Sequence, residues 1–207
     1  MKSFTEFLDE GRSNVLHAFD MDETLLAHDH KHLKIHVRDA QGKLIRSLTN
    51  QEFNKYKLKP GEHYDFKDFK SAKILGQSAQ PIKPMINRLN NLKRRGFKTE
   101  IVTARSDLDN KQQDRKHFMR YGINIDTTHL RRAGNVEGTS TGDRKRRVLS
   151  DLIKKHGYRE VHLYDDDIGN HKHFAKLKQD HPGIRLVSHV VRHNERTGRT
   201  NTVTIRH

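Results

Sequence analysis

The stretch VLHAFDMDETLL, residues 15–26, places two aspartates one residue apart directly after an apolar run. The run VLHAF has the composition of a short buried strand, so Asp20 begins the loop beyond its end. Two carboxylates this close together repel each other unless a cation lies between them. We therefore expect Asp20 and Asp22 to lie beside a divalent cation and a phosphate at the end of a strand.

Strands and helices alternate through most of the remaining chain. The clearest helix, at 81–96, carries its apolar residues on one face, has prolines near its start and stops at Gly96. We expect further helices at 109–122, 142–157 and 168–180, and strands at 97–104, 126–132, 160–166 and 183–191. This alternation predicts an α/β fold with a central parallel sheet and helices on both faces.

The segment between the first strand and residue 81 follows a different pattern. Residues 33–48 alternate apolar and polar positions on both sides of DAQGK, which predicts a hairpin with Gly42 in its turn. Residues 49–80 have no clear period, and we expect loop and short helix there. Residues 192–207 are basic, and we expect them to form a loose C-terminal tail.

The formal net charge is +15 for 207 residues, before any of the 16 histidines is protonated. A potential of this sign concentrates polyanions at the surface and favours nucleic acid as a partner; the alternative is a solubility charge spread over all faces. The chain has no cysteine, so a bound metal must be held by oxygen or imidazole. No run reaches the roughly 20 apolar residues of a membrane span, and we expect a soluble protein.

Polar residues follow three of the expected strands. Asp20 and Asp22 follow the first strand, Thr103 ends the strand at 97–104, and residues 165–167 are three aspartates after the strand at 160–166. If these strands are neighbours, the polar side chains converge on one crevice. Carboxylates gathered there suit Mg²⁺, which favours phosphoryl transfer. Lys145 is the best-placed cation to hold a phosphate, and Thr103 could donate a hydrogen bond to it.

These motifs resemble the haloacid dehalogenase superfamily of phosphatases. The four motifs of that superfamily are matched in order by VLHAFDMDET, EIVTAR, Lys145 and VHLYDDD. The resemblance implies a Rossmann-like fold in which Asp20 is the nucleophile and Asp22 the general acid and base. It also implies that Thr103 and Lys145 hold the phosphate. The Mg²⁺ ligands that it implies are Asp20, Asp22, Asp165 and Asp166.

The resemblance further implies a phosphatase domain at 11–191 with a small cap inserted at about 27–80. Such a cap leaves the crevice open to a large substrate. Basic runs at 131–132 and 144–147 lie near the expected edge of the crevice and favour an anionic polymer. Lys145 is surrounded by arginines in its run, and any one of these side chains could face solvent. The acidic strand end loosely resembles nucleic-acid repair phosphatases, although Asp167 stands where an arginine is usual.

Residues 1–10, MKSFTEFLDE, resemble the capsid-targeting leaders of internal head proteins of T-even-like phages. That resemblance implies removal by a prohead protease after Leu8-Asp9-Glu10; an ordinary amphipathic helix is the alternative. Two functions remain open. One is a Mg²⁺-dependent phosphatase that acts through an aspartyl-phosphate on a nucleotide or polynucleotide end, in the cytoplasm of an infected host cell. The other is a non-catalytic, DNA-associated internal protein of the phage head.

Overall fold

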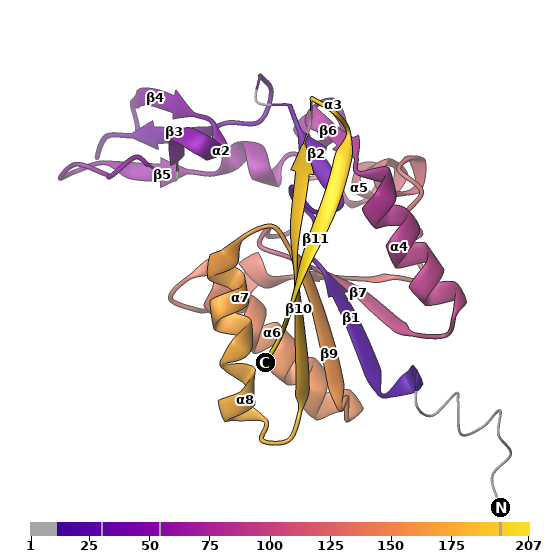
Figure 1. The fold of residues 1–207 in the computed structure, drawn as a ribbon. Coiled ribbons are helices and arrows are strands. Elements are labelled where there is room, and N and C mark those ends of the chain that lie inside the picture. Colours follow the sequence, from indigo (N-terminus) through magenta and orange to yellow (C-terminus); the bar gives the residue numbers. More distant parts are fainter. Residues whose placement is uncertain (1–11, 30, 54, 195) are drawn as a thin grey trace, which may run out of the picture.

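The computed structural model describes residues 12–29, 31–53, 55–194 and 196–207. Its central sheet has the strand order β11-β10-β9-β1-β7-β8, and every neighbouring pair is parallel except β10 with β11 (Figure 1). The strands are β1 (Val15–Phe19), β7 (Lys98–Thr103), β8 (His129–Arg132), β9 (Glu160–Asp165), β10 (Arg185–Asn194) and β11 (Arg199–Arg206). The expected parallel sheet is thereby confirmed. The expected leader, residues 1–10, lies outside the described residues.

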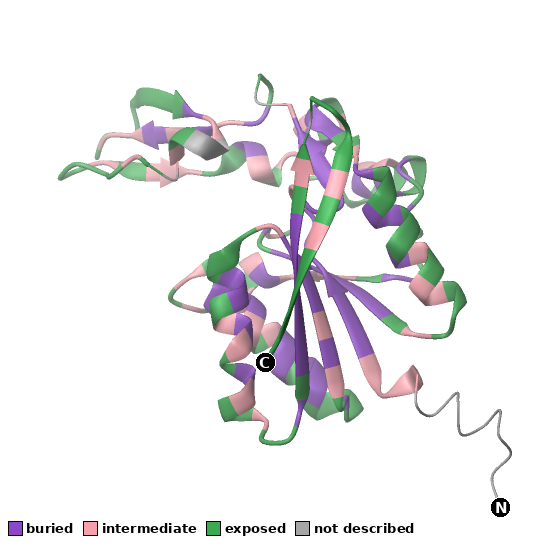
Figure 2. Ribbon diagram, viewed as in Figure 1, coloured by how far each residue is buried: buried purple, intermediate pink, exposed green. Residues whose placement is uncertain are grey.

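Helices cover both faces of this sheet, as the sequence predicts. On one face lie α6 (Thr141–His156), α7 (Ile168–Ala175) and α8 (Leu177–Asp180), which bury Leu16 and Ala18 of β1. On the other lie α3 (Ala72–Ser78), α4 (Lys83–Arg94) and α5 (Lys111–Arg120), which bury Phe19. Adjacent residues of β1 therefore point to opposite cores, because side chains alternate across a strand. Figure 2 shows the central strands buried along most of their length.

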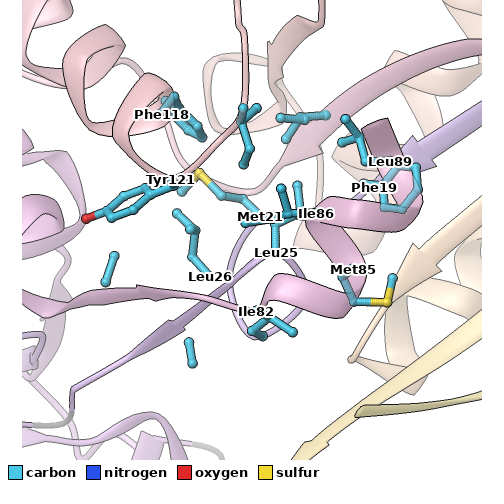
Figure 3. Packing of buried hydrophobic residues seen from close by; sticks show 14 of the residues in the cluster. Phe19, Met21, Leu25, Leu26, Ile82, Met85, Ile86, Leu89, Phe118 and Tyr121 are labelled. Atoms are coloured by element: carbon cyan, nitrogen blue, oxygen red, sulfur yellow. The ribbon is translucent and has the colours of Figure 1, made fainter. Parts of the chain in front are cut away.

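The core beneath α4 fixes the start of the site. Met85, Ile86 and Leu89 of α4 form one hydrophobic cluster with Phe19, and Met21 of the loop after β1 belongs to the same cluster (Figure 3). Full burial of one such side chain contributes about 1.5–3 kcal/mol. Because Phe19 and Met21 are both fully buried, the loop that carries Asp20 is anchored on each side of that residue.

The C-terminal segment forms a strand, so the expected loose tail at 192–207 is wrong. β11 pairs with β10 from Asn194↔Arg199 to Val187↔Arg206, and Gly198 takes a φ of 66° in the turn between them. The β-branched residues of TVTI suit an edge strand, and this preference outweighs the basic charge that suggested a tail. Charged side chains are in fact common on edge strands because they discourage pairing with other chains.

A separate lobe projects from the segment in which the sequence places a cap. It contains a sheet of order β4-β3-β5, made from β3 (Ile35–Arg38), β4 (Leu44–Leu48) and β5 (His63–Asp65). The hairpin expected at 33–48 is confirmed as β3 and β4, whereas β5 was not expected from the sequence. The lobe also holds α2 (Asn50–Phe53) and a 3₁₀ turn, Lys67–Lys70. We call residues 33–70 the cap.

Two short strands, β2 (Leu26–His28) and β6 (Ala79–Pro81), join the cap to the body as an antiparallel pair. The helix expected at 168–180 is divided into α7 and α8, with Lys176 between them. None of the helices in the described part of the chain combines the length and the apolarity that a membrane span requires.

Candidate active site

The carboxyl ends of β1, β7 and β9 lie side by side, because β1 pairs in parallel with both of the others. Asp20 follows β1, Thr103 ends β7, and Asp165 ends β9. The backbone N–H of Asp20 donates to the carbonyl of Tyr164 at 2.8 Å, so the first aspartate is fixed beside the acidic strand end. The condition on which the sequence made this convergence depend, that the three strands are neighbours, is therefore met.

Lys145 connects the two acidic strand ends. Its Nζ lies 2.7 Å from Asp20 Oδ1 and 2.7 Å from Asp165 Oδ2, and all three side chains are buried. Burial by itself lowers the pKa of Lys145, but the charges of Asp165 and Asp20 outweigh it and raise this pKa above its ordinary value. The ammonium group is therefore held in its charged form.

The arginines around Lys145 have other roles. Ser140 caps the N-terminus of α6 by accepting a hydrogen bond from the Asp143 N–H, and this places Lys145 in the first turns of the helix, facing the sheet. Arg146 and Arg147 both pair with Asp143. Of the basic run at 144–147, Lys145 is the residue that contacts the acidic strand ends.

Asp20, Asp165 and Asp166 form a group that could hold a metal ion, since each offers an oxygen within 4.8 Å of the others. Burial and then the charge of Asp165 raise the pKa of Asp166 to about 7, although Lys145 opposes the shift. Burial likewise raises the pKa of Asp20 above its ordinary value, with Lys145 acting in the opposite direction. One lysine therefore does not neutralise the group, and a divalent cation fits this excess of buried oxygen ligands.

Asp165 is the most firmly held of the three. Asn170 of α7 donates to both of its carboxylate oxygens, at 3.0 and 3.1 Å, and the backbone N–H of Asp167 donates to Oδ1 at 3.0 Å. His171 contacts the Asp165 carbonyl oxygen through Nε2 at 3.0 Å. Since its oxygens already have these donors and Lys145, Asp165 orients the group, and Asp20 and Asp166 have more freedom to bind a cation.

Asp22 is held away from this group. Arg105 Nη2 donates to its Oδ1 at 2.7 Å and Nε lies 3.0 Å from each oxygen, while His28 Nε2 lies 2.6 Å from Oδ1. Burial by itself raises the pKa of Asp22, but the charges of Arg105 and His28 outweigh it and hold this pKa well below its ordinary value. Asp22 is therefore an ionised carboxylate beside the metal-binding group rather than a member of it.

Thr103 contributes less directly than the sequence indicates. Thr103 is fully buried, and its Oγ1 accepts the N–H of Arg105 at 3.2 Å. The next residues along the chain, Ala104 to Ser106, line the cavity in its place. Asp167 caps α7 by accepting the Gly169 N–H at 2.7 Å. Thr103 therefore shapes the loop beside the carboxylates, whereas Asp167 both caps α7 and lines the cavity.

A cavity of about 820 Å³ opens above the carboxylates. Asp20, Asp22, Lys145 and Asp166 are among the residues that line it. The cap and the starts of α6 and α7 also contribute to the lining, through Ile35, Phe53, Phe66, Phe69, Lys70, Thr141, Arg144, Ile168 and Asn170. This volume lies within the roughly 300–1,000 Å³ of small-molecule sites.

No protein-family model matches this chain, and no curated protein matches it.

Four residues that the sequence did not indicate complete the site: Arg105, His28, Asn170 and Arg192. Arg105 follows Thr103 by two positions in VTAR, and a basic residue so close to an expected strand end was an available signal. Arg192 belongs to the segment expected to be a tail, and the end of β10 carries it to the cavity. His28 and Asn170 have no local pattern that separates them from surface residues.

Proposed function

We propose that this chain is a Mg²⁺-dependent phosphomonoesterase of the haloacid dehalogenase type, acting through an aspartyl-phosphate on a nucleotide or polynucleotide end. The observation that carries the proposal is the division of the aspartates between two environments. Asp20 lies against Lys145 and the other metal-binding oxygens, whereas Asp22 is held apart by Arg105. Two carboxylates with separate environments suit separate catalytic roles, as nucleophile and as proton carrier.

In the first step, a carboxylate oxygen of Asp20 attacks phosphorus, and the bond between phosphorus and the leaving oxygen breaks. Asp22 in its protonated form passes its proton to that oxygen. Lys145 holds Asp20 in place and offers positive charge to the phosphate. Mg²⁺, when bound by Asp20 and Asp166, supplies charge that neutralises the phosphate oxygens. In the second step, water attacks phosphorus, Asp22 takes the proton, and the bond to Asp20 breaks to release phosphate.

The ion pair between Arg105 and Asp22 favours the second step of this cycle over the first. Because Asp22 is held ionised, it is already in the form that can accept a proton from water in the second step, although the same charge weakens it as a base. Donation in the first step requires the contact with Arg105 to loosen as the substrate binds. The substrate phosphate is a competing acceptor for the Arg105 guanidinium, which makes such loosening chemically reasonable.

The proposal is tested by measuring phosphate release from 3′-phosphate and 5′-phosphate oligonucleotides and from mononucleotides. We expect release that requires Mg²⁺ and that Asp20→Asn abolishes, because an amide oxygen is too weak a nucleophile. Asp107→Asn makes the same change at an exposed aspartate outside the cavity lining and should retain activity. Turnover in Asp20→Asn would contradict the role of Asp20. No release from any substrate would favour the non-catalytic, DNA-associated protein instead.

A further inference from the structure

The cap presents an exposed aromatic ring to the cavity. Phe66 is 40% exposed, which is unusual for a large apolar side chain and leaves its hydrophobic surface in water. Its ring lies nearly perpendicular to those of Phe53 and Phe69, with centroids 5.7 and 6.2 Å apart. Edge-to-face neighbours of this kind hold a ring in one orientation. All three rings line the cavity.

Besides Arg105, which pairs with Asp22, two arginines line the cavity, one from α6 and one from β10. Arg192 donates through Nη1 to the carbonyl oxygen of Asp166, which holds an otherwise exposed guanidinium next to the metal-binding group. The Nε of Arg144 is buried and has no hydrogen-bond partner among the described residues. Neither arginine has an acidic partner within the described part of the chain, in contrast to Arg146 and Arg147.

These cations exceed what a single phosphate group requires. Lys145 already faces Asp20, and a bound divalent cation adds further positive charge at the reacting phosphate. Arg144 and Arg192 are therefore available to bind a second anion beside the reacting phosphate. Guanidinium groups suit phosphate oxygens because their N–H donors match the geometry of the anion.

From this arrangement we propose that the cavity binds the unpaired end of a single-stranded polynucleotide. The terminal base stacks on Phe66, and the phosphodiester next to the terminal phosphate binds Arg192 and Arg144. The inference rests on the proposed function, since it assumes that the terminal phosphate lies at Asp20. Base stacking on an aromatic side chain needs an exposed base, which a single strand offers and a closed duplex end does not.

Other phosphate esters satisfy only part of this site. A sugar phosphate has neither a flat aromatic face for Phe66 nor a second anion for the arginines. A mononucleotide has the base but lacks the phosphodiester. A phosphopeptide with a single phosphate leaves both arginines without an anion. The experiment therefore compares substrates that lose one of these features at a time.

The kinetic test measures kcat/KM for a single-stranded dinucleotide that carries a 3′ or a 5′ terminal phosphate. Glycerol phosphate, a mononucleotide and a dinucleotide with an abasic terminal residue are the comparison substrates. We expect Phe66→Ala to lower the ratio of kcat/KM for the dinucleotide to that for glycerol phosphate about tenfold. We expect Arg192→Gln to lower the ratio of dinucleotide to mononucleotide by about the same factor.

Matched controls make the same changes outside the cavity. Leu58→Ala removes another exposed apolar side chain of the cap, and Arg199→Gln removes an exposed charge from the same hairpin as Arg192. Neither control should alter these ratios. The proposal is overturned if Phe66→Ala and Arg192→Gln leave both ratios unchanged, or if wild-type protein does not distinguish the abasic dinucleotide from the intact one.

A binding measurement separates this inference from the proposed chemistry. Fluorescence anisotropy of a labelled, terminally phosphorylated single strand is followed with Asp20→Asn in the presence of Mg²⁺, where no turnover is needed. We expect weaker binding when Phe66→Ala or Arg192→Gln is added, and weaker binding of a strand with an abasic end. Phosphate release without these differences in binding would support the proposed phosphatase and refute the proposed binding of the terminal base and the phosphodiester. These differences in binding without any phosphate release would support the proposed binding of the terminal base and the phosphodiester and refute the proposed phosphatase.

Discussion

Arg105 determines how Asp22 behaves, since its guanidinium contacts both oxygens of that carboxylate from a nearly fully buried position. We expect Arg105→Gln to destabilise the fold by on the order of 3 kcal/mol, because it leaves a charged partner without compensation. The double variant Asp22→Asn with Arg105→Gln should recover part of this loss, because no unpaired charge remains. Urea unfolding of the two single variants and the double variant measures the coupling. A double variant as unstable as the sum of the singles would contradict the pairing.

Arg105→Gln should also change how folding stability depends on pH. Without the Arg105 charge, the pKa of Asp22 rises toward its ordinary value, because burial remains and the main opposing charge is gone. Folding stability that depends on ionised Asp22 is present above the unfolded pKa and is lost as pH falls through the folded pKa. As the pH falls, wild-type protein should therefore retain the contribution of ionised Asp22 to folding stability down to a lower pH than Arg105→Gln does.

Sequence alone placed most of the candidate site but not the contacts within it. Asp20, Lys145, Asp165 and Asp166 come together because strand ends and a helix start could be read from local patterns. The separation of Asp22 could not be predicted, because it depends on a guanidinium 83 positions away in the chain. Local pattern indicates where a strand ends, but not which distant partner a loop side chain meets.

Gly134 lets a short 3₁₀ turn (Ala133–Asn135) pack directly against the loop that carries Arg105. A Cβ at this position would lie 2.5 Å from the Ala104 carbonyl oxygen and from the Ser106 nitrogen, both backbone atoms. We expect Gly134→Ala to push this loop away, lower stability by about 1–3 kcal/mol and reduce the proposed phosphatase activity. Gly183→Ala is the control: its φ is 92° but the space around it is open. It should cost about 1–2 kcal/mol through backbone strain, with activity retained.

The helices and strands with strong periodicity were predictable, and the irregular ones were not. The regions around α4, β7, α6 and β9 carry apolar faces bounded by glycine or capping residues, and their approximate positions agree with expectation. β5 and β11 escaped prediction because a short or edge strand buries too few residues to show alternation. Their place depends on pairing with β3 and β10, which is tertiary information.

A row of stacked histidines crosses the sheet on the face that α4 partly covers. The ring of His17 lies 4.4 Å from that of His162, which in turn lies 5.2 Å from His189. Burial, followed by the charge of His162, lowers the pKa of His17 to about 3 and that of His189 to about 4. Arg88 lowers both further, whereas Glu160 acts on His162 in the opposite sense.

Histidines kept neutral in the folded state make the whole molecule sensitive to acid. Their contribution is complete above the unfolded pKa of about 6.5 and falls as pH drops toward the folded values, because the unfolded chain binds protons first. For His17 alone the expected loss between pH 6.5 and pH 5 is about 2 kcal/mol. Urea midpoints measured across this range should fall less steeply in His17→Phe than in wild type. Identical slopes would show that His17 does not contribute.

The position of β1 at the centre of the sheet has a consequence for the order of folding. The strands β7 and β8 pair with each other and are close in sequence, and the same is true of β9, β10 and β11. The partners of β1 are distant in sequence, because Leu16 pairs with Lys98 and Val15 pairs with Glu160. Contacts between such distant residues form late, since the entropy of closing long loops opposes them. Asp20 thus joins the other carboxylates only when β1 inserts between these two groups of strands. In refolding experiments, the phosphatase activity proposed for this site should be the last property to return.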